Sequence, residues 1–418
     1  MWRAIVIFLA VYGGLVVSRK HRPVIAWVGI LTALILGVLK PLEIITSVNW
    51  NVIGIFVGSL FIAELFIFSR IPETISDWLI NRSPSLGFAY LSIIIFTSLL
   101  SAFIENVAAV LIVAPIALQL ARKMKVSPIP VIVGLAISSN LQGTATLIGD
   151  PPSMILAAQM KMNFLDFFVY QGKPGIFFMV EIGAMAGFLV LYLFLRTIRQ
   201  KPGYIQVTPV RTWVPVWLIS IMIVLLSLAS FIDKDFTWFG GTACILIGVV
   251  GLVWCRVIDR DAAGRLARSF DWRTTAFLAA IFVLVGMLER RGAIDALVGR
   301  LVDLGDMSPF LVYTIVVWLS VFISAFIDNV PYVTAMLPLV ISLSERLGYP
   351  REVLAFGVLI GACLGGNITP IGASANIVAA GLLQKEGFPI SFGTFVKIGF
   401  PFAVAATGAA YVALWLVK

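Results

Sequence analysis

The residues of this sequence that are best able to do chemistry are acidic side chains inside apolar segments. They are Glu64, Glu105, Asp150, Glu181 and Asp328. The sequence predicts no lysine or arginine beside them at that depth. A carboxylate inside a bilayer is costly unless it is paired, protonated or in contact with water, so these side chains are candidates for a transport function.

Two of these acids follow the same four residues, Ser-Ala-Phe-Ile, and each precedes an asparagine, in Glu105-Asn106 and Asp328-Asn329. Each pair begins a helix after a turn, which brings a carboxylate, an amide and free backbone N–H groups together. The alternative is a helix cap, for which Asp and Asn are suited and Glu is poorly suited. Capping does not explain why the acid recurs at bilayer depth. We therefore predict that Glu105 and Asp328, together with Asp150, couple transport to a proton or cation, and that both asparagines bind substrate.

A second pair of motifs interrupts two apolar helices with glycine, proline and small polar residues. The candidate substrate-binding residues in them are Gly143, Thr144 and Thr146 in the first half, and Gly366, Asn367, Thr369, Ser374 and Asn376 in the second. Irregular backbone at this depth is tolerated only where it lines a cavity or is buried in protein. The alternative is a packing kink. Asp150 has an alanine, Ala373, at the matching position, and capping of the resumed helix is its alternative role.

Three further residues leave their role open. Coupling and a hydrogen-bonded structural role are equally consistent with Glu64 and Glu181. Cys363 directly precedes the second interrupted segment, where a small core residue is the simpler interpretation than a soft ligand for a metalloid.

The composition places these residues in an α-helical membrane protein. Of the 418 residues, 60% are hydrophobic and 12% are charged, about half the charged fraction of a soluble domain. Apolar runs such as 4–17 and 214–232 approach the length that spans a bilayer. The net charge of +9 fits basic cytoplasmic loops and does not indicate nucleic acid binding. No Ser/His, Cys/His or His-rich constellation indicates an enzyme, a metal site or a bound cofactor, and Met1–Val17 is interpreted as a first span, not a cleavable signal.

An internal repeat organises the chain. The two acidic motifs and the two interrupted helices recur at one offset without gaps, so we divide the chain into repeats 1–200 and 213–418 with a linker at 201–212. The scaffold spans are predicted in 4–68 and 213–288, and the transport parts in 87–195 and 308–416. In the first repeat the predicted segments are 4–17, 23–40, 50–68, an amphipathic segment 71–83, a hairpin of 87–104 and 106–121, a broken helix 129–162, and 175–195. In the second they are 213–232, 238–255, 274–288, an amphipathic segment 290–304, a hairpin of 308–327 and 328–344, a broken helix 352–383, and 393–416.

The topology follows from counting crossings. A re-entrant hairpin returns the chain to its starting side, so each repeat has five spans, an odd number, and the second repeat must be inverted. Basic loops such as Arg19–Arg22 and Arg122–Lys125 are typical of the cytoplasmic side. This orientation predicts an inner (plasma) membrane protein with both termini outside.

At these motifs the sequence resembles the arsenite permease and Na+/H+ antiporter (ArsB/NhaD) branch of the ion transporter superfamily, which is related to divalent anion/sodium symporters. The matching stretches are SAFIENVAAVLIVAP, GTATLIGDPPSMI, SAFIDNVPYVTAMLP and GGNITPIGASANI. The sequence departs from that family at Ser153, where the family often has Asn. The resemblance implies a homodimeric elevator, in which 71–83 and 290–304 link scaffold and transport parts, and a soluble ATPase partner in arsenite systems.

The function expected from residues and resemblance together is proton-coupled efflux of a small inorganic solute, arsenite or antimonite. The pocket of threonine, asparagine and serine suits a neutral oxyacid, and the carboxylates Glu105 and Asp328 suit proton exchange. The first alternative is Na+/H+ antiport, in which the same oxygens bind a hard cation. The second is transport of a dicarboxylate or another anion at helix N-termini.

Overall fold

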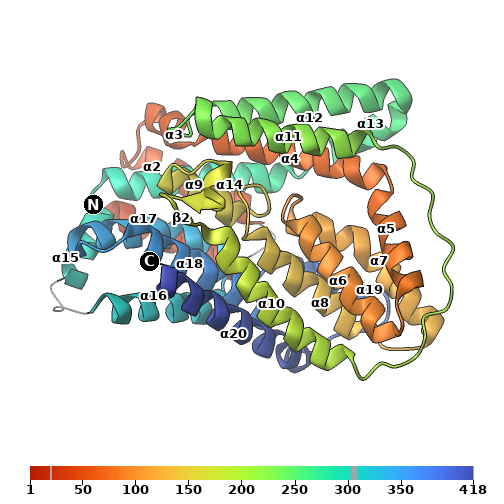
Figure 1. Cartoon of the computed structure of the whole chain (residues 1–418). Coiled ribbons are helices and arrows are strands. Elements are labelled where there is room, and N and C mark those ends of the chain that lie inside the picture. Colours follow the sequence, from red (N-terminus) through yellow and green to blue (C-terminus); the bar gives the residue numbers. More distant parts are fainter. Residues whose placement is uncertain (19–20, 303–307, 418) are drawn as a thin grey trace.

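The structure, a computed structural model, describes residues 1–18, 21–302 and 308–417, and these residues form mostly helices (Figure 1). The first half contains α1 (Trp2–Val17), α2 (Arg22–Ile35), α3 (Pro41–Ser47), α4 (Trp50–Phe68), α5 (Ile71–Arg82), α6 (Leu86–Ser101), α7 (Asn106–Met124), α8 (Ile129–Gly143), α9 (Pro151–Met160), η2 (Phe164–Phe167), β1 (Val169–Tyr170), β2 (Lys173–Pro174) and α10 (Ile176–Leu195). The second half contains α11 (Val214–Ile232), α12 (Phe239–Ile258), α13 (Arg260–Ser269), α14 (Trp272–Arg290), α15 (Ala293–Val302), α16 (Pro309–Ser324), α17 (Asn329–Leu347), α18 (Arg351–Gly365), η3 (Gly366–Ile368), α19 (Ser374–Lys385) and α20 (Phe392–Val417). Within the described residues, eight helices are long and apolar enough to cross a membrane, and five shorter helices are apolar.

The helices of the two halves follow the same order. The helices of the hairpin, α6 and α7, have counterparts α16 and α17 whose first residues lie 223 positions later, Leu86 to Pro309 and Asn106 to Asn329. The broken helix α8–α9 has its counterpart in α18–α19. The same local sequence therefore produces the same local structure twice.

The helices are arranged in two layers, which we call the scaffold layer (α1–α4 and α11–α14) and the hairpin layer (α6–α10 and α16–α20). In Figure 1, α4, α11, α12 and α14 lie at the top, and α6, α8, α10, α16, α18 and α20 lie below them. In the scaffold layer α4 packs on α12, and in the hairpin layer α10 packs on α20. Close approach in the scaffold layer depends on glycine, because a Cβ on Gly54 would lie 2.7 Å from the Cα atom of Gly241.

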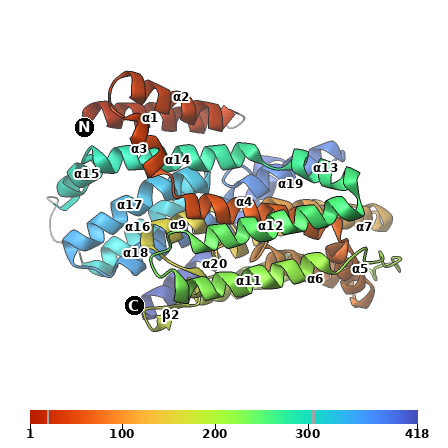
Figure 2. The ribbon, with the colours of Figure 1, turned by 90° about the horizontal axis from the view of Figure 1, so that it is seen from above.

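Two helices connect these layers at opposite ends of the molecule. α5 follows α4 and precedes α6, and α15 follows α14 and precedes α16. The views in Figures 1 and 2 agree that α5 and α13 lie at one end and α15 and the start of α1 at the other. The linker between the halves is extended and lies against α5, where Thr208 N–H donates to Asp77 (2.8 Å) and Ile205 N–H donates to Asn81 (2.9 Å).

The structure differs from the sequence prediction mainly in short elements. The predicted span 23–40 ends at Ile35 because Gly37 adopts a left-handed conformation (φ +66°), and α3 starts at Pro41. The amphipathic helix α13, the turn η2 and the strand pair β1–β2 were not predicted. Of the predicted segment 290–304, residues 303–304 lie outside the described residues, and α15 begins after Gly292 (φ +66°).

Candidate functional site

The two hairpin tips hold their acids at the first turn of a helix. The Glu105 carboxylate accepts a hydrogen bond from Ala108 N–H (2.9 Å) at the start of α7. The Asp328 carboxylate accepts one from Val330 N–H (3.2 Å) at the start of α17. Both acids are therefore N-caps, including the glutamate that sequence preference disfavours, and each uses one oxygen in the cap. The surroundings of the other oxygen distinguish the two acids.

Close backbone contacts hold the interruptions of the broken helices against the hairpins. A Cβ on Gly149 would lie 2.6 Å from Gly143 O and 2.7 Å from Ser101 O, so only glycine fits where α8 gives way to α9. The Thr146 hydroxyl donates to the carbonyl oxygen of Ala102, and 223 residues later the Thr369 hydroxyl donates to that of Ala325. Thr146 and Thr369 were predicted to bind substrate. In the structure, the hydroxyl of each donates to the hairpin backbone and fixes the interruption to its hairpin.

Two further polar residues hold the backbone of the interruptions. Ser153 Oγ is placed to donate to the carbonyl oxygens of Gly143 (3.3 Å) and Thr144 (3.2 Å). Its counterpart in the second half, Asn376, donates through Nδ2 to the carbonyl oxygens of Gly366 and Thr369 (3.0 Å each). Ser153 therefore does the same work as Asn376 in the other repeat.

A cluster of buried asparagines joins the two halves at the level of the tips. Asn140 Nδ2 donates to Asn367 Oδ1 (2.9 Å) and to the carbonyl oxygen of Cys363 (2.8 Å). Asn140 Oδ1 accepts from Asn106 Nδ2 (3.2 Å) and Asn329 Nδ2 (3.4 Å). Each of these asparagines is at most 3% exposed. Asn140 was missed by the sequence prediction, although its place in the polar run Ser138-Ser139-Asn140 of an apolar helix is a usable signal.

One donor in this cluster is left over. Asn367 Nδ2 is buried and has no hydrogen-bond partner among the described residues. Buried amide groups are almost always hydrogen-bonded, so this unpaired donor is an exception, although Asn367 is linked to the tips through Asn140 and does not itself line the cavity beside the cluster.

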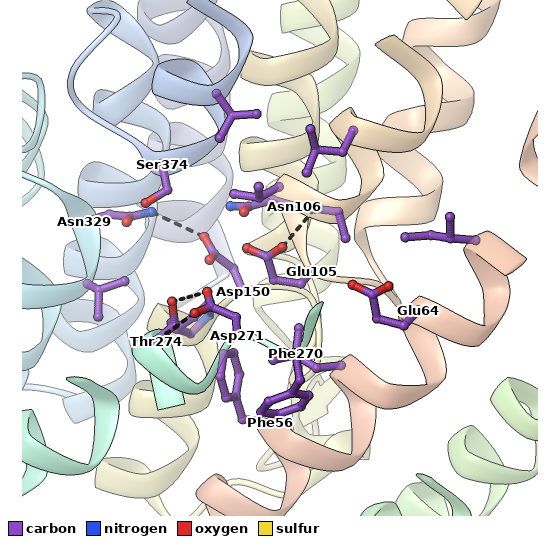
Figure 3. Close-up of a pocket in the computed structure, with 18 residues that line it drawn as sticks. Phe56, Glu64, Glu105, Asn106, Asp150, Phe270, Asp271, Thr274, Asn329 and Ser374 are labelled. Carbon is purple, nitrogen blue, oxygen red and sulfur yellow. Dashed lines mark hydrogen bonds between the residues drawn. The ribbon is translucent and has the colours of Figure 1, made fainter. Parts of the chain in front are cut away.

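A cavity of about 460 Å³ opens beside this cluster (Figure 3). Carboxylates line it, and they come from both layers. They are Glu64 of α4, Glu105 at the tip, Asp150 and Asp271. Asn106, Asn329, Thr274 and Ser374 add amides and hydroxyls, and no lysine, arginine or histidine is among the described residues that line the cavity. The site therefore presents acidic and neutral hydrogen-bonding groups at the boundary between the two layers.

The acids of this lining differ in how they are held. The carboxylate of Asp150 accepts from Asn329 Nδ2 (3.3 Å) and makes no cap hydrogen bond to α9, the alternative role considered for it. Asp271 caps α14 and accepts from Thr274 N–H (3.0 Å). Figure 3 shows the carboxylates of Asp150 and Glu105 directed into the same space, with Glu64 facing Glu105 from α4. Asp271 lies between the predicted segments 238–255 and 274–288, so the sequence prediction did not place it in the membrane.

Asp328 has a different environment. Arg22 Nη1 lies 2.9 Å from Asp328 Oδ2, and the two side chains are 14% and 1% exposed. Ser374 Oγ donates to the same carboxylate oxygen (3.2 Å). The prediction that no basic residue accompanies the acids at depth is wrong, because α2 begins at Arg22 against the tip. Arg19 and Lys20, which belong to the same predicted loop, lie outside the described residues.

The remaining candidates lie at the periphery of the cavity. Glu181 accepts a hydrogen bond from Gln142 and does not line the cavity. Cys363 is fully buried, with Sγ 3.8 Å from Asn329 Nδ2. Among the described residues, no group of three or more His, Cys, Asp or Glu side chains could hold a metal ion.

Comparison with known proteins gives a family and a fold. The family model described as citrate transporter (CitMHS) matches residues 12–361 and 243–418. A 46 kDa membrane protein of Mycobacterium leprae is 26% identical over 99% of this chain and 98% of its own length. An uncharacterized transporter of Mycobacterium tuberculosis is 27% identical over 88% of this chain and 87% of its own length. The P protein of Sus scrofa is 24% identical over 96% of this chain, which spans 58% of that protein.

Solved structures with a similar fold are also transporters. The YdaH transporter of Alcanivorax borkumensis aligns over 90% of this chain and 86% of its own with a TM-score of 0.61 at 15% identity. MtrF of Neisseria gonorrhoeae, described within a class of antimetabolite efflux pumps, aligns over 93% of this chain and 83% of its own with a TM-score of 0.54 at 15% identity. At these identities the likeness concerns the fold alone.

Proposed function

The chain belongs to the citrate transporter (CitMHS) family, and on that premise we propose that this secondary transporter exports a small neutral oxyacid in exchange for protons. The solute proposed is arsenite or antimonite, which at neutral pH is the uncharged trihydroxide. One observation carries the proposal, namely an acidic cavity that none of the described lysine, arginine or histidine residues lines. Several relatives are named as transporters, which are not enzymes.

Charge decides between the substrate classes. Two like charges 4 Å apart repel by about 4 kcal/mol at the effective dielectric of a protein surface. A fully ionised citrate would meet such repulsion from Glu105 and Asp150 together, and would be accepted only with bound protons or a cation that cancels its charge. A neutral trihydroxide avoids this cost. Its three hydroxyls can donate to the carboxylates of Glu105 and Asp150 and accept from the amides of Asn106 and Asn329, which line the cavity.

Proton coupling is assigned to Glu105 and Asp150 in this proposal. Both carboxylates face the cavity, where neighbouring like charges favour binding of a proton. Asp328, the third acid predicted to couple transport, is paired with Arg22 and needs no proton to be neutralised. The two tips therefore have unequal roles, with the first tip carrying the proton and the second serving as a fixed anion.

The transport movement we propose is an elevator built from two inverted repeats. The cavity supports it, because Glu64 and Asp271 come from the scaffold layer while Glu105 and Asp150 come from the hairpin layer. Displacement of one layer past the other, with α5 and α15 as arms and with a homodimer formed through scaffold helices, would carry the solute across. Basic residues at the α5–α13 end, among them Arg82, Arg122, Arg256 and Arg268, support a cytoplasmic location for that end, with both termini outside the inner membrane.

Flux assays in proteoliposomes test the function. Wild-type protein is expected to move arsenite in response to a proton gradient, and the single variants Glu105→Gln and Asp150→Asn are expected to lose the proton dependence. The matched control is Glu345→Gln, which removes an exposed carboxylate. Full proton-coupled arsenite transport by both cavity variants would refute the assignment.

A second candidate function, Na+/H+ antiport, is favoured by the same acidic lining, since carboxylate and amide oxygens also suit a hard cation. Adding Na+ without arsenite separates the two functions, because only an antiporter then releases protons. Citrate with and without Mg2+ completes the comparison. Uptake of citrate without a cation would overturn the charge argument itself.

A further inference from the structure

A groove on the outer surface of the scaffold layer lies where α12 ends and α13 begins. Its volume is about 440 Å³, and it is lined by Leu252, Val253, Arg256, Arg260, Ala263 and Gly264. Apolar side chains of α12 lead into it from the membrane-spanning part, with Val249 48% and Val253 58% exposed. The groove therefore combines an apolar approach with two guanidinium groups at its polar end.

The two arginines have no acidic partner of their own in the described part of the chain. Both side chains are exposed, and neither forms an ion pair there. The acid between them, Asp259, is committed elsewhere: it lies 2.9 Å from Arg211 Nη2 and accepts from Ala262 N–H (2.8 Å) as the cap of α13. Asp259 is therefore not available to pair with either arginine of the groove.

α13 has the pattern of a helix that lies in the membrane interface. Ala262, Ala263 and Leu266 face the protein and are buried, while Arg265 and Arg268 are exposed beside Arg260. A short helix with one buried apolar face and one basic face lies at the boundary of headgroups and acyl chains and is attracted to anionic lipid. Both Figures 1 and 2 place α13 at the end of the molecule that carries α5.

We propose that this groove binds an anionic phospholipid. The phosphate is held by Arg256 and Arg260, since guanidinium groups form paired hydrogen bonds to phosphate oxygens. The acyl chains lie along Val249 and Val253, where the exposed apolar surface of α12 continues the groove into the bilayer. Charge complementarity selects this occupant over a zwitterionic lipid, whose headgroup brings its own cation.

The groove is connected to the transport cavity through one short segment. Phe270 directly follows α13, and its ring stacks on Phe61 of α4 with centroids 4.4 Å apart. The next residue, Asp271, lines the cavity and caps α14. A lipid held on α13 therefore stabilises the position of one wall of the cavity.

The test compares lipid binding to the full chain by native mass spectrometry, with phosphatidylglycerol and phosphatidylcholine as the probes. The variant is Arg256→Gln/Arg260→Gln, and the control is Arg196→Gln/Arg199→Gln, which removes two exposed arginines from the end of α10. Each arginine near anionic lipid contributes about fivefold in affinity, so the groove variant is expected to lose on the order of 30-fold for phosphatidylglycerol. Phosphatidylcholine binding is expected to stay unchanged.

Three results would overturn the proposal. The first is an equal loss of phosphatidylglycerol binding in the groove and control variants, which would indicate a diffuse charge effect. The second is equal binding of the two lipids by wild-type protein. The third is a change in the monomer–dimer ratio of the groove variant with lipid affinity intact, which would assign the groove to contact between two copies of the chain. Because all four arginines are exposed, the variants are expected to fold.

Discussion

Removal of Arg22 tests the asymmetry between the hairpin tips. In Arg22→Gln the carboxylate of Asp328, whose side chain is 1% exposed, loses its only ion-pair partner among the described residues. At 2.9 Å the direct attraction is about 6 kcal/mol for an effective dielectric of about 20. Breaking a buried pair by removing one partner costs about 3–5 kcal/mol. We expect the lower end, about 3 kcal/mol, because Arg22 is 14% exposed and Ser374 still donates to Asp328.

The matched control is an ion pair of the same length on the surface. Arg351 Nη2 lies 2.8 Å from Glu345 Oε1, but the two side chains are 58% and 47% exposed. Arg351→Gln is therefore expected to cost less than about 1 kcal/mol. The comparison isolates burial, since the distance between the charged atoms is nearly the same.

The assay is unfolding in detergent titrated with SDS, applied to both single variants and to Arg22→Gln/Asp328→Asn. The double variant no longer buries an unpaired charge, so it is expected to be more stable than Arg22→Gln alone. Equal stability of wild type and Arg22→Gln would refute the reasoning. Additive losses in the double variant would refute it too, because they would show that the two side chains do not interact.

Three other variants test separate parts of the structure. Gly149→Ala is expected to abolish stable expression or transport, because its Cβ would lie within 2.7 Å of two backbone carbonyl oxygens, whereas Gly13→Ala, with nothing within 4 Å, is expected to be neutral in the same assays. Asn140→Ala leaves the amides of Asn106 and Asn329 without their shared acceptor, and we expect arsenite efflux to fall at least about tenfold with the protein still folded. In the loop after α11, burial raises the pKa of Asp233, but N–H groups of Trp238, Thr237 and Phe239 lower it more, so that the net pKa is below the usual value. The stability contributed by Asp233 is therefore present above about pH 4 and is lost as the pH falls through the folded-state pKa. In Asp233→Asn, the melting temperature is expected to depend less on pH between about pH 2 and 5 than it does in the wild type.

The sequence was most informative where the two halves agree. The acids of the tips, their asparagines and the interruptions at Gly143 and Gly366 could be predicted because each recurs at one offset. The cavity contains three of these predicted residues from the tips, Glu105, Asn106 and Asn329, and also Asp150 and Ser374. A repeat reveals positions that are constrained in both copies, which in this chain are the positions that fix the hairpins and helix breaks.

Residues without a counterpart could not be found in this way. Asn140 belongs to the four-asparagine cluster. Its counterpart in the second half is Cys363, and because the two residues differ, comparison of the repeats does not identify Asn140. Arg22 belongs to a basic loop whose charge predicts a position at the cytoplasmic surface. In the structure, Arg22 is the first residue of the short helix α2 and pairs with Asp328 at the second hairpin tip. Asp271 reaches the cavity because α13, which was not predicted, returns the chain to the start of α14. For Asn140 the missing information is a contact between the two halves within the hairpin layer, and for Arg22 and Asp271 it is a contact between the two layers.

The difference between the tips has a consequence for the charge of the site. If Asp328 also faced the cavity unpaired, a neutral solute would enter beside five acids, and each crossing would require more of them to be neutralised. Arg22 removes Asp328 from that set, while Ser374 connects Asp328 to the edge of the cavity. In the proposed mechanism, the protons that balance the site act on Glu105 and Asp150, which lie in the hairpin layer, while Glu64 and Asp271 belong to the scaffold layer. A proton on Glu105 or Asp150 lowers the repulsion between the layers, and so it favours the same relative movement that would carry the solute.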